Sequence, residues 1–331
     1  MRLGVLTGGG DCPGLNAAIR AIVRRASVAY PDDIVGFHNG WQGVVEDDAM
    51  ALDVAACRGI LPQGGTILAT SRFNPFKSAT DTERIAETIA HRHIDALIAI
   101  GGEGSLRIAR EVSDLGIPVV GIPKTIDNDV FGTKRCIGFD TAVATAADAI
   151  DRVQTTGESH DRLMVVEVMG RSTGWLAVCA GISAGADALC LPEEKTDLDQ
   201  LAAAIRRRHD AGSSSSVVVV AEGAKLVGSR RSSEGTAGSR ASTGLAERTG
   251  YETRLTVLGH IQRGGPPSAA DRLLATTCGV GAINAIHASQ FGSLVSVADD
   301  AINLVPLELV AESRRPVPEL LLDVARKLTV R

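Results

Sequence analysis

The chain has 331 residues, of which 44% are hydrophobic, 22% are charged and only 3% are aromatic, and its formal net charge is −5. This length is typical of about two domains, and this composition is typical of a globular protein. The scarcity of aromatic side chains argues against a stacking surface for single-stranded nucleic acid, and the net charge argues against nucleic acid as the main partner.

Two further features bear on where the protein functions. No apolar run reaches the ~18 residues that a membrane span requires, and the first residues predict a strand rather than a signal peptide. The six cysteines are scattered and form no C-x-x-C pair, so neither a zinc site nor a disulfide framework is indicated. We therefore expect free buried thiols and a cytoplasmic protein without a membrane partner.

The first predicted elements are a strand over Leu3–Thr7, a glycine-rich segment and a helix over Leu15–Ala29. This order presents backbone N–H groups and a helix N-terminus to a phosphate. The loop is neither a Walker A sequence nor G-x-G-x-x-G. Because tight turns also need glycine for steric reasons, phosphate binding and a purely structural role remain equal alternatives here.

Short strands are then predicted over Ile34–Phe37 and Ile67–Thr70. Arg72 follows the second of these and is either a solvated surface residue or an anion ligand. A helix over Glu83–Arg92 comes next, with its apolar residues on one side.

The strand–glycine loop–helix unit then repeats. A strand over Asp95–Ile100 leads into Gly101–Ser105, and a helix continues to about Val112. The loop contains Glu103, which either favours the helix N-terminus electrostatically or binds a metal ion that is itself bound to phosphate.

A third polar loop follows the buried strand predicted over Ile117–Ile122. It contains Lys124, Thr125, Asp127 and Asp129. Taken alone, an Asx-rich turn is the simpler interpretation, although two carboxylates beside a cation and a hydroxyl also suit proton abstraction. Three polar loops at the carboxyl ends of candidate parallel strands predict a nucleotide or phosphate crevice.

The remaining pattern alternates helices with strands that again end in polar residues. Arg171 follows the strand over Leu163–Met169, Glu222 follows Val217–Val220, and His260 and Arg263 follow Leu255–Leu258. We expect a mobile surface loop in the first half of Gly228–Thr249 and a helix over Thr243–Arg248. Other expected elements are helices over Ala142–Val153, Trp175–Ala184, Asp197 to about Arg208, Ser268–Ala288 and Glu319–Leu328, and a strand over Ala188–Leu191.

Five segments, in this order, carry a family resemblance: Thr7–Asn16, Gly101–Ser105, Pro123–Asp129, Met169–Arg171 and Gly259–Gly265. Together they resemble 6-phosphofructokinase of the bacterial type, and the match covers nearly the whole chain. The resemblance implies an α/β fold of two Rossmann-like three-layer domains with mostly parallel sheets and an active site in the cleft between them. Residues 1–138 plus about 260–310 would form the domain for the phosphoryl donor, and residues 139–259 plus about 311–331 the domain for fructose 6-phosphate.

The resemblance also implies roles for individual residues in phosphoryl transfer to the 1-hydroxyl of fructose 6-phosphate. Asp127 would be the base, Thr125 and Arg171 would stabilise the moving phosphoryl group, and Asp129 would help to position the sugar and the metal. The residues expected at ATP are Gly10, Arg72, Phe73, Gly102, Glu103, Gly104 and Ser105. Glu103 would bind Mg²⁺, although the family commonly has Asp there.

The sugar would be held by Met169, Gly170, Glu222 and Arg254, and its 6-phosphate by His260 and Arg263. In the family, the residues that match Arg162 and Arg254 reach the sugar phosphate of a neighbouring subunit. We therefore expect an oligomer with shared active sites, a homotetramer or, alternatively, a homodimer.

The phosphoryl donor is less clear from the sequence because two positions disagree. Pyrophosphate-using relatives carry Asp where this chain has Gly104, and Lys where it has Lys124, whereas typical ATP users carry Gly at both. A carboxylate at position 104 would crowd and repel the α-phosphate of ATP, so Gly104 favours ATP. The main hypothesis is an ATP-dependent 6-phosphofructokinase, and the alternative is a pyrophosphate-dependent phosphotransferase.

Two other classes of function are weaker. A non-catalytic sensor on the same fold is disfavoured because Asp127, Arg171 and both donor loops are present. An oxidoreductase is disfavoured because the chain has no G-x-G-x-x-G motif with a later acidic residue for a dinucleotide. The arginine-rich effector site of bacterial relatives is represented by Arg25 but also by Ala21, Val54, Gln154 and Ser213. We therefore expect weak or altered control by nucleoside diphosphate or phosphoenolpyruvate.

Overall fold

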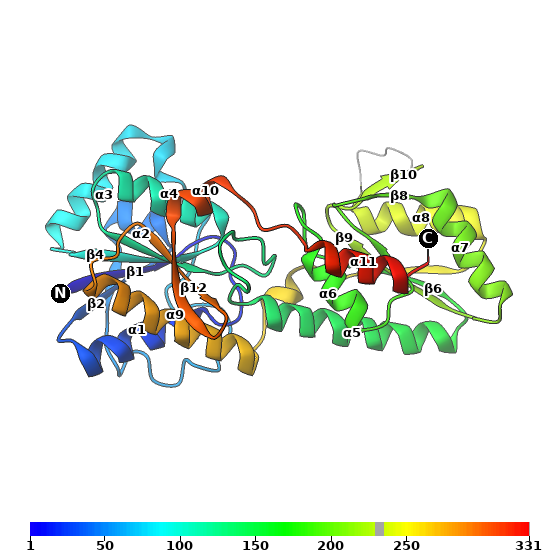
Figure 1. Ribbon diagram of the computed structural model, residues 1–331, viewed down its shortest axis with the longest axis horizontal. Helices are drawn as coiled ribbons and strands as arrows, with labels where there is room; N and C mark the ends of the chain where they lie inside the picture. Colours follow the sequence, from blue (N-terminus) through cyan, green and yellow to red (C-terminus); the bar gives the residue numbers. More distant parts are fainter. Residues whose placement is uncertain (229–234, 331) are drawn as a thin grey trace. The chain divides into compact units, whose positions relative to one another are not determined.

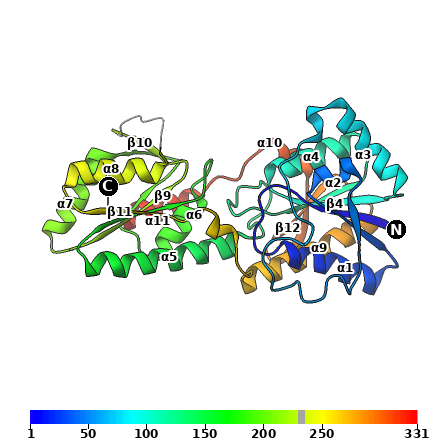
Figure 2. The same cartoon turned by 180° about the vertical axis from the view of Figure 1, so that it is seen from behind.

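The computed structural model describes residues 1–228 and 235–330, which divide into two compact units. Unit 1 contains residues 1–141 and 263–315, and unit 2 contains residues 142–262 and the segment from Pro316 onward. Each unit has its own sheet with helices on both faces (Figures 1 and 2). The mostly parallel α/β class predicted from the sequence is confirmed.

The sheet of unit 1 has seven strands in the order β13-β12-β5-β4-β1-β2-β3. Its five inner strands run parallel, and β3 and β13 pair antiparallel at its two edges. Its inner strands are buried on both faces, as expected for a parallel sheet covered by helices. The strands are β1 (Arg2–Thr7), β2 (Asp33–Phe37), β3 (Ala49–Leu52), β4 (Ala96–Gly101), β5 (Val119–Pro123), β12 (Ser293–Ala298) and β13 (Ala301–Pro306).

Two long helices, α1 (Leu15–Ala29) and α9 (Ala269–His287), cover one face of this sheet (Figures 1 and 2). They approach closely because α9 has Gly279 at the contact, where a Cβ atom would lie 2.7 Å from that of Ala21. The other face packs against α2 (Trp41–Glu46), α3 (Ala79–His91), α4 (Glu103–Asp114) and α10 (Leu307–Glu312), and a short 3₁₀ helix, η1 (Pro75–Lys77), precedes α3.

Unit 2 is built on a smaller parallel sheet with the order β11-β6-β9-β7. Helices α7 and α8 cover one face, and α5 and α6 lie along the other (Figures 1 and 2). The strands are β6 (Leu163–Val168), β7 (Ala188–Cys190), β9 (Ser216–Ala221) and β11 (Thr253–Val257), and β8 (Lys195–Asp197) pairs separately with β10 (Lys225–Val227). The helices are α5 (Phe139–Ser159), α6 (Trp175–Ser183), α7 (Leu198–Asp210), α8 (Ala237–Thr249), η2 (Gly259–Arg263) and α11 (Glu319–Leu328).

Most predicted elements are present, but the strand predicted over Ile67–Thr70 is wrong. This segment is a turn, in which Ala69 adopts a left-handed φ of 52°. The side chain of Asn16 accepts a hydrogen bond from the Ile67 N–H, and the hydroxyl of Thr66 accepts one from the Leu68 N–H. Side chains thus take the place of a neighbouring strand.

The other sequence expectations in this part are mixed. Helix α8 begins at Ala237, six residues before the helix predicted over Thr243–Arg248, and the mobile loop expected before it includes residues 229–234, which lie outside the described residues. The six cysteines are free thiols, as predicted, and five of them are buried. In the described part of the chain, no helix is both long enough and apolar enough to cross a membrane.

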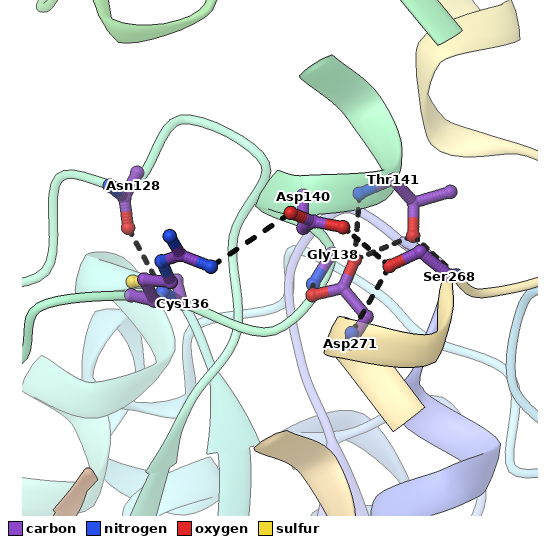
Figure 3. A network of polar contacts seen from close by, with 8 residues as sticks. Asn128, Cys136, Gly138, Asp140, Thr141, Ser268 and Asp271 are labelled. Carbon is purple, nitrogen blue, oxygen red and sulfur yellow. Dashed lines mark hydrogen bonds and ion pairs between the residues drawn. The ribbon is translucent and has the colours of Figure 1, made fainter. Parts of the chain in front are cut away.

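A buried carboxylate fixes the start of α5 in unit 1 (Figure 3). Asp271, only 1% exposed, accepts hydrogen bonds from the backbone N–H groups of Gly138 (2.9 Å) and Thr141 (2.8 Å) and from the Thr141 hydroxyl (2.5 Å). Ser268 in turn accepts from the Asp271 N–H and donates to Asp140. The N-termini of α5 and α9 therefore share one hydrogen-bonded network, in which side-chain oxygens satisfy N–H groups that a helix start leaves unpaired.

We predict that Asp271→Ala lowers the free energy of unfolding by about 3 kcal/mol, because three buried donors lose their acceptor. Asp271→Asn keeps one side-chain oxygen and should cost less. Denaturant unfolding of the three proteins measures both values, and an Ala variant as stable as the parent would contradict this assignment.

Candidate functional site

The three polar loops predicted from the sequence begin at one edge of the unit 1 sheet. Strand β4 lies between β1 and β5, and its register pairs Ile100 with Thr7 and Gly101 with Pro123. The ladder continues into the loops, where Gly8 N–H donates to Ile100 O and Lys124 N–H donates to Gly101 O, both at 2.9 Å. The loops after β1, β4 and β5 therefore lie side by side at the carboxyl edge, where ligands bind in open α/β sheets.

The glycines of the first two loops have a demonstrable steric role. A Cβ atom on Gly8 would lie 2.5 Å from the Ser105 hydroxyl, and one on Gly101 would lie 2.3 Å from the Ser105 Cβ. Gly9 adopts a φ of +85°, which L side chains rarely adopt. Because these positions are glycines, no side chain covers the loop backbone there, and a ligand can approach it.

These loops line a cavity of about 430 Å³ in unit 1. Its lining includes five lysine or arginine side chains against three carboxylates, and α4 begins at it with Glu103 as its first residue. Positive side chains and a helix N-terminus both favour an anion. The lining residues are Gly9, Gly10, Ser71, Arg72, Phe73, Asn74, Lys77, Gly102, Glu103, Gly104, Ser105, Arg107, Ile108, Glu111, Lys124, Thr125, Asp127 and Arg263.

This cavity brings together all seven residues expected at the phosphoryl donor, with Thr125, Asp127 and Arg263 beside them. Asp129 is not part of its lining. The sequence analysis missed Lys77, Arg107 and Glu111. The spacing of Glu103 and Arg107, four residues apart on one helix, was the available signal for Arg107.

Lys124, in the third loop, is buried and reaches the backbone of the first loop. It is 2% exposed, and its Nζ donates to the carbonyl oxygens of Gly8 (2.8 Å) and Gly10 (2.5 Å). Burial, with a smaller contribution from the nearby Arg263 guanidinium, lowers the pKa of Lys124 below its usual value. Lys124 therefore uses two of its three donors to hold the glycine loop.

The third loop presents two carboxylates two residues apart. The Thr125 hydroxyl accepts a hydrogen bond from the Asp127 N–H at 3.1 Å, and Asn128 adopts a left-handed φ of 52°. The Asn128 side chain accepts from the Cys136 N–H at 2.9 Å (Figure 3). Burial, and then the like charge of Asp127, raise the pKa of Asp129 above its usual value. The loop is thus shaped by local hydrogen bonds and concentrates negative charge.

Glu103 is the carboxylate that the sequence assigns to a metal. Its Oε1 pairs with Arg107, and its Oε2 accepts from the Nε (3.0 Å) and NH2 (2.6 Å) of Arg314. No group of three His, Cys, Asp or Glu side chains among the described residues could hold a metal ion. Mg²⁺ characteristically takes one or two carboxylates and completes its shell with water and substrate phosphates. Glu103 fits that pattern as a single protein ligand, once an arginine releases one of its oxygens.

In unit 2, Arg171, Glu222 and His260 follow the carboxyl ends of β6, β9 and β11, respectively. The Nε of Arg171 donates to Glu222 at 2.7 Å. Gly170 has a φ of +124°, and a Cβ atom there would lie 2.7 Å from the Thr173 carbonyl oxygen, so only glycine suits this turn. The backbone N–H of Met169 donates to Gln262, and His260 is exposed in η2.

Arg162 and Arg254 lie at the opposite end of the unit 2 sheet. Arg162 directly precedes β6, Arg254 is the second residue of β11, and both pair with Glu252. Strand β6 is six residues long, so the two ends of the sheet are about 17 Å apart. These two arginines are therefore separated from Arg171 and Glu222 of the same chain.

Arg25, the one arginine of the expected effector set, already has partners in unit 1. Its Nε donates to Asn284 at 3.0 Å, and its guanidinium lies 5.4 Å from the centre of the Tyr30 ring. Weak or altered effector control stays a prediction.

Comparisons with known proteins agree on one family. The model of the family described as phosphofructokinase matches residues 2–286. A Streptomyces coelicolor protein named ATP-dependent 6-phosphofructokinase 3 is 47% identical, over 96% of this chain and 97% of its own. Another protein of that organism, named pyrophosphate–fructose 6-phosphate 1-phosphotransferase, is also 47% identical, over 93% of each chain.

A solved structure is similar over almost the whole chain. The crystal structure of Pichia pastoris phosphofructokinase in the T-state is 31% identical, covers 99% of this chain and has a TM-score of 0.86. The present chain spans 36% of that chain's length.

We predict that Lys124 makes stability depend on pH in the alkaline range. Because its pKa is lowered by folding, the unfolded chain holds more protons between the folded pKa and about 10.4, and stability rises with pH there by up to about 1.4 kcal/mol per unit. Lys124→Met should remove this rise, whereas Lys134→Met, at an exposed lysine, should keep it. Denaturant unfolding at pH 7 and pH 9.5 measures the difference, and equal slopes in all three proteins would contradict the prediction.

Proposed function

The chain belongs to the phosphofructokinase family, and on that premise we propose that it is an ATP-dependent 6-phosphofructokinase. Such an enzyme transfers the γ-phosphoryl group of ATP to the 1-hydroxyl of fructose 6-phosphate and releases fructose 1,6-bisphosphate and ADP. The observation that supports this most strongly is the cationic cavity of unit 1, which has α4 and two glycine loops at one side and Asp127 in its lining.

We propose that the cavity binds the phosphates of ATP. The glycine loops leave room for backbone N–H groups to approach the phosphates, and Arg72, Arg107 and Arg263 add positive charge. Glu103 would hold the magnesium ion, which supplies positive charge to the β- and γ-phosphates. Lys124 would mainly maintain the shape of the first loop, because two of its three donors bind carbonyl oxygens of that loop. One donor would be left for a phosphate.

Asp127 would act as the general base. Its carboxylate takes the proton of the sugar 1-hydroxyl while that oxygen bonds to the γ-phosphorus, and the bond from phosphorus to the bridging oxygen breaks as ADP leaves. Thr125, whose hydroxyl accepts from the Asp127 N–H, and Arg171 would stabilise the transferring group. Asp129 would help to position the sugar and the metal.

Two observations support ATP as the donor. A Cβ atom on Gly104 would meet no atom within 4 Å, and Gly104 is exposed at the cavity, so the position offers space. Lys124 is the residue shared with pyrophosphate users. It donates two hydrogen bonds to backbone carbonyl oxygens, so its presence is explained by the structure of the loop and does not require pyrophosphate as the donor. A pyrophosphate-dependent phosphotransferase remains the second candidate, because a relative of that name is equally similar.

The sugar would bind to Met169, Gly170, Arg171 and Glu222 of unit 2, with its 6-phosphate on His260 and Arg263. We propose that Arg162 and Arg254 serve the sugar phosphate of another subunit. Their place at the far end of the sheet from Arg171 supports this. A homotetramer would satisfy this requirement, and a homodimer is the alternative.

The experiment that tests the proposal supplies purified protein, fructose 6-phosphate and Mg²⁺ with either ATP or pyrophosphate. We expect formation of fructose 1,6-bisphosphate with ATP. Turnover with pyrophosphate alone would move the assignment to the second candidate, and no turnover with either would leave a binding protein.

We predict that Asp127→Ser lowers kcat by at least 10²-fold, as expected for loss of a general base. The KM for ATP should change far less, because the hydroxyl acceptor and not the nucleotide is the partner of Asp127. Initial-rate kinetics measure both constants, and an unchanged kcat would remove Asp127 from this role.

We predict that Gly104→Asp raises the KM for ATP by at least tenfold while the protein stays folded. The side chain has space at the cavity surface, but its charge repels the polyphosphate. Gly116→Asp serves as a control for an added carboxylate, because Gly116 lies outside the cavity lining and also has no atom within 4 Å of its Cβ position. Since Gly116 has a φ of +84°, the stability of this control is measured alongside its kinetics. Unaltered ATP kinetics in Gly104→Asp would contradict the argument for ATP.

A further inference from the structure

The segment of residues 313–315, here called the arginine strap, lies against the loop that contains the two aspartates. The backbone of Arg314 forms an antiparallel bridge with Val130. The N–H of Arg315 donates to the Asp129 carbonyl oxygen at 2.9 Å, and its guanidinium donates to the Asn128 carbonyl oxygen at 3.4 Å. The arginine strap is therefore attached to this loop through main-chain pairing and through the Arg315 side chain.

From this position the side chain of Arg314 reaches the first residue of α4. Its Nε and NH2 both donate to Glu103 Oε2, at 3.0 and 2.6 Å, while Arg107 holds Oε1 from within the same helix. The Glu103 side chain is only 17% exposed. Both oxygens of the carboxylate are thus occupied by guanidinium groups, one from α4 itself and one from the last residues of unit 1.

A divalent cation cannot bind Oε2 beside this guanidinium. Mg²⁺ binds carboxylate oxygen at about 2.0–2.1 Å, so the metal and the Arg314 nitrogens would compete for the same lone pairs and would repel each other. Arg107 is anchored on the same helix as Glu103, whereas the Arg314 side chain comes from a separate segment. Arg314 is therefore the partner that can leave without altering α4.

Asp129 is a second carboxylate near Arg314. The positive charge of Arg314 acts on Asp129 and opposes the rise in the pKa of that carboxyl group. The backbone of the arginine strap stays paired with the loop of Asp129 when the Arg314 side chain rotates, because main-chain contacts of Arg314 and Arg315 hold it there and the Arg314 guanidinium does not.

We propose that Arg314 is a positioning residue that pairs with Glu103 and competes with a divalent cation for this carboxylate. The inference rests on the proposed function, in which Glu103 is the metal ligand. When a metal-bound donor enters, Arg314 leaves Oε2 and its charge moves towards Asp129 and the phosphates. The arginine strap thereby links occupation of the donor site to the electrostatics of the aspartate loop.

The test is the ratio of two affinities for a nonhydrolysable ATP analogue, measured calorimetrically with EDTA and with Mg²⁺. By linkage, this ratio reports how strongly the bound metal stabilises the complex. Arg314→Ala removes the competitor and should raise the ratio about fivefold, the scale of a half-exposed ion pair. Arg314→Gln should raise it similarly and Arg314→Lys should leave it near the parent value, so that a folding defect in one variant does not decide the outcome.

Two controls separate this inference from the proposed function. Arg110→Ala removes an arginine of α4 that pairs with Asp114 and should leave the ratio unchanged. Glu103→Gln should lower the ratio towards one. If Glu103→Gln has no effect, the metal role of Glu103 fails. If Glu103→Gln lowers the ratio but neither Arg314→Ala nor Arg314→Gln raises it, the metal role stands and the competition is refuted.

Discussion

The hydrogen bonds that join β4 to β1 on one side and to β5 on the other determine where the chemistry of this protein lies. Their register brings Thr7, Gly101 and Pro123 to the same edge of the sheet, so three loops from distant parts of the sequence begin next to one another. A shift of one residue would turn each side chain of the shifted strand to the other face. The cavity, its positive charge and the position of Asp127 all depend on this alignment.

Close packing at this edge is achieved with groups that are costly to bury. Glycines allow Ser105 to sit against two loops. The charged end of Lys124 enters the interior, where two carbonyl groups of the first loop accept its hydrogen bonds. Asp271 has a similar role at the start of α5. Lys124 and Asp271 are thus buried polar side chains that replace backbone hydrogen bonds that irregular segments lack.

The sequence predicted the order of most strands and helices, because buried parallel strands and glycine loops have local signatures. The seven residues that the family resemblance assigns to the donor line one cavity, and their role stays a prediction. The sequence-based prediction failed at Ile67–Thr70, where the apolar pattern suits a strand but Asn16 and Thr66 satisfy the backbone instead. It did not single out Arg314, which meets Glu103 only through tertiary pairing with Val130. It left the role of Lys124 ambiguous, because a lysine beside a phosphate site is expected to bind an anion. The carbonyl partners of Lys124 are visible in the fold and not in the sequence. Local patterns thus revealed the loops, whereas the pairing of charged side chains depended on contacts distant in sequence.

The central claim is that the unit 1 cavity binds a nucleotide whose terminal phosphoryl group passes to a sugar hydroxyl. Phosphorus NMR of a mixture of the protein, ATP, Mg²⁺ and fructose 6-phosphate tests this most directly, because it follows each phosphorus atom. We expect the γ-phosphate resonance to decline as ADP and a new phosphomonoester at carbon 1 of the fructose appear in equal amounts. Persistence of the ATP resonances, or release of inorganic phosphate without the sugar ester, would contradict the account.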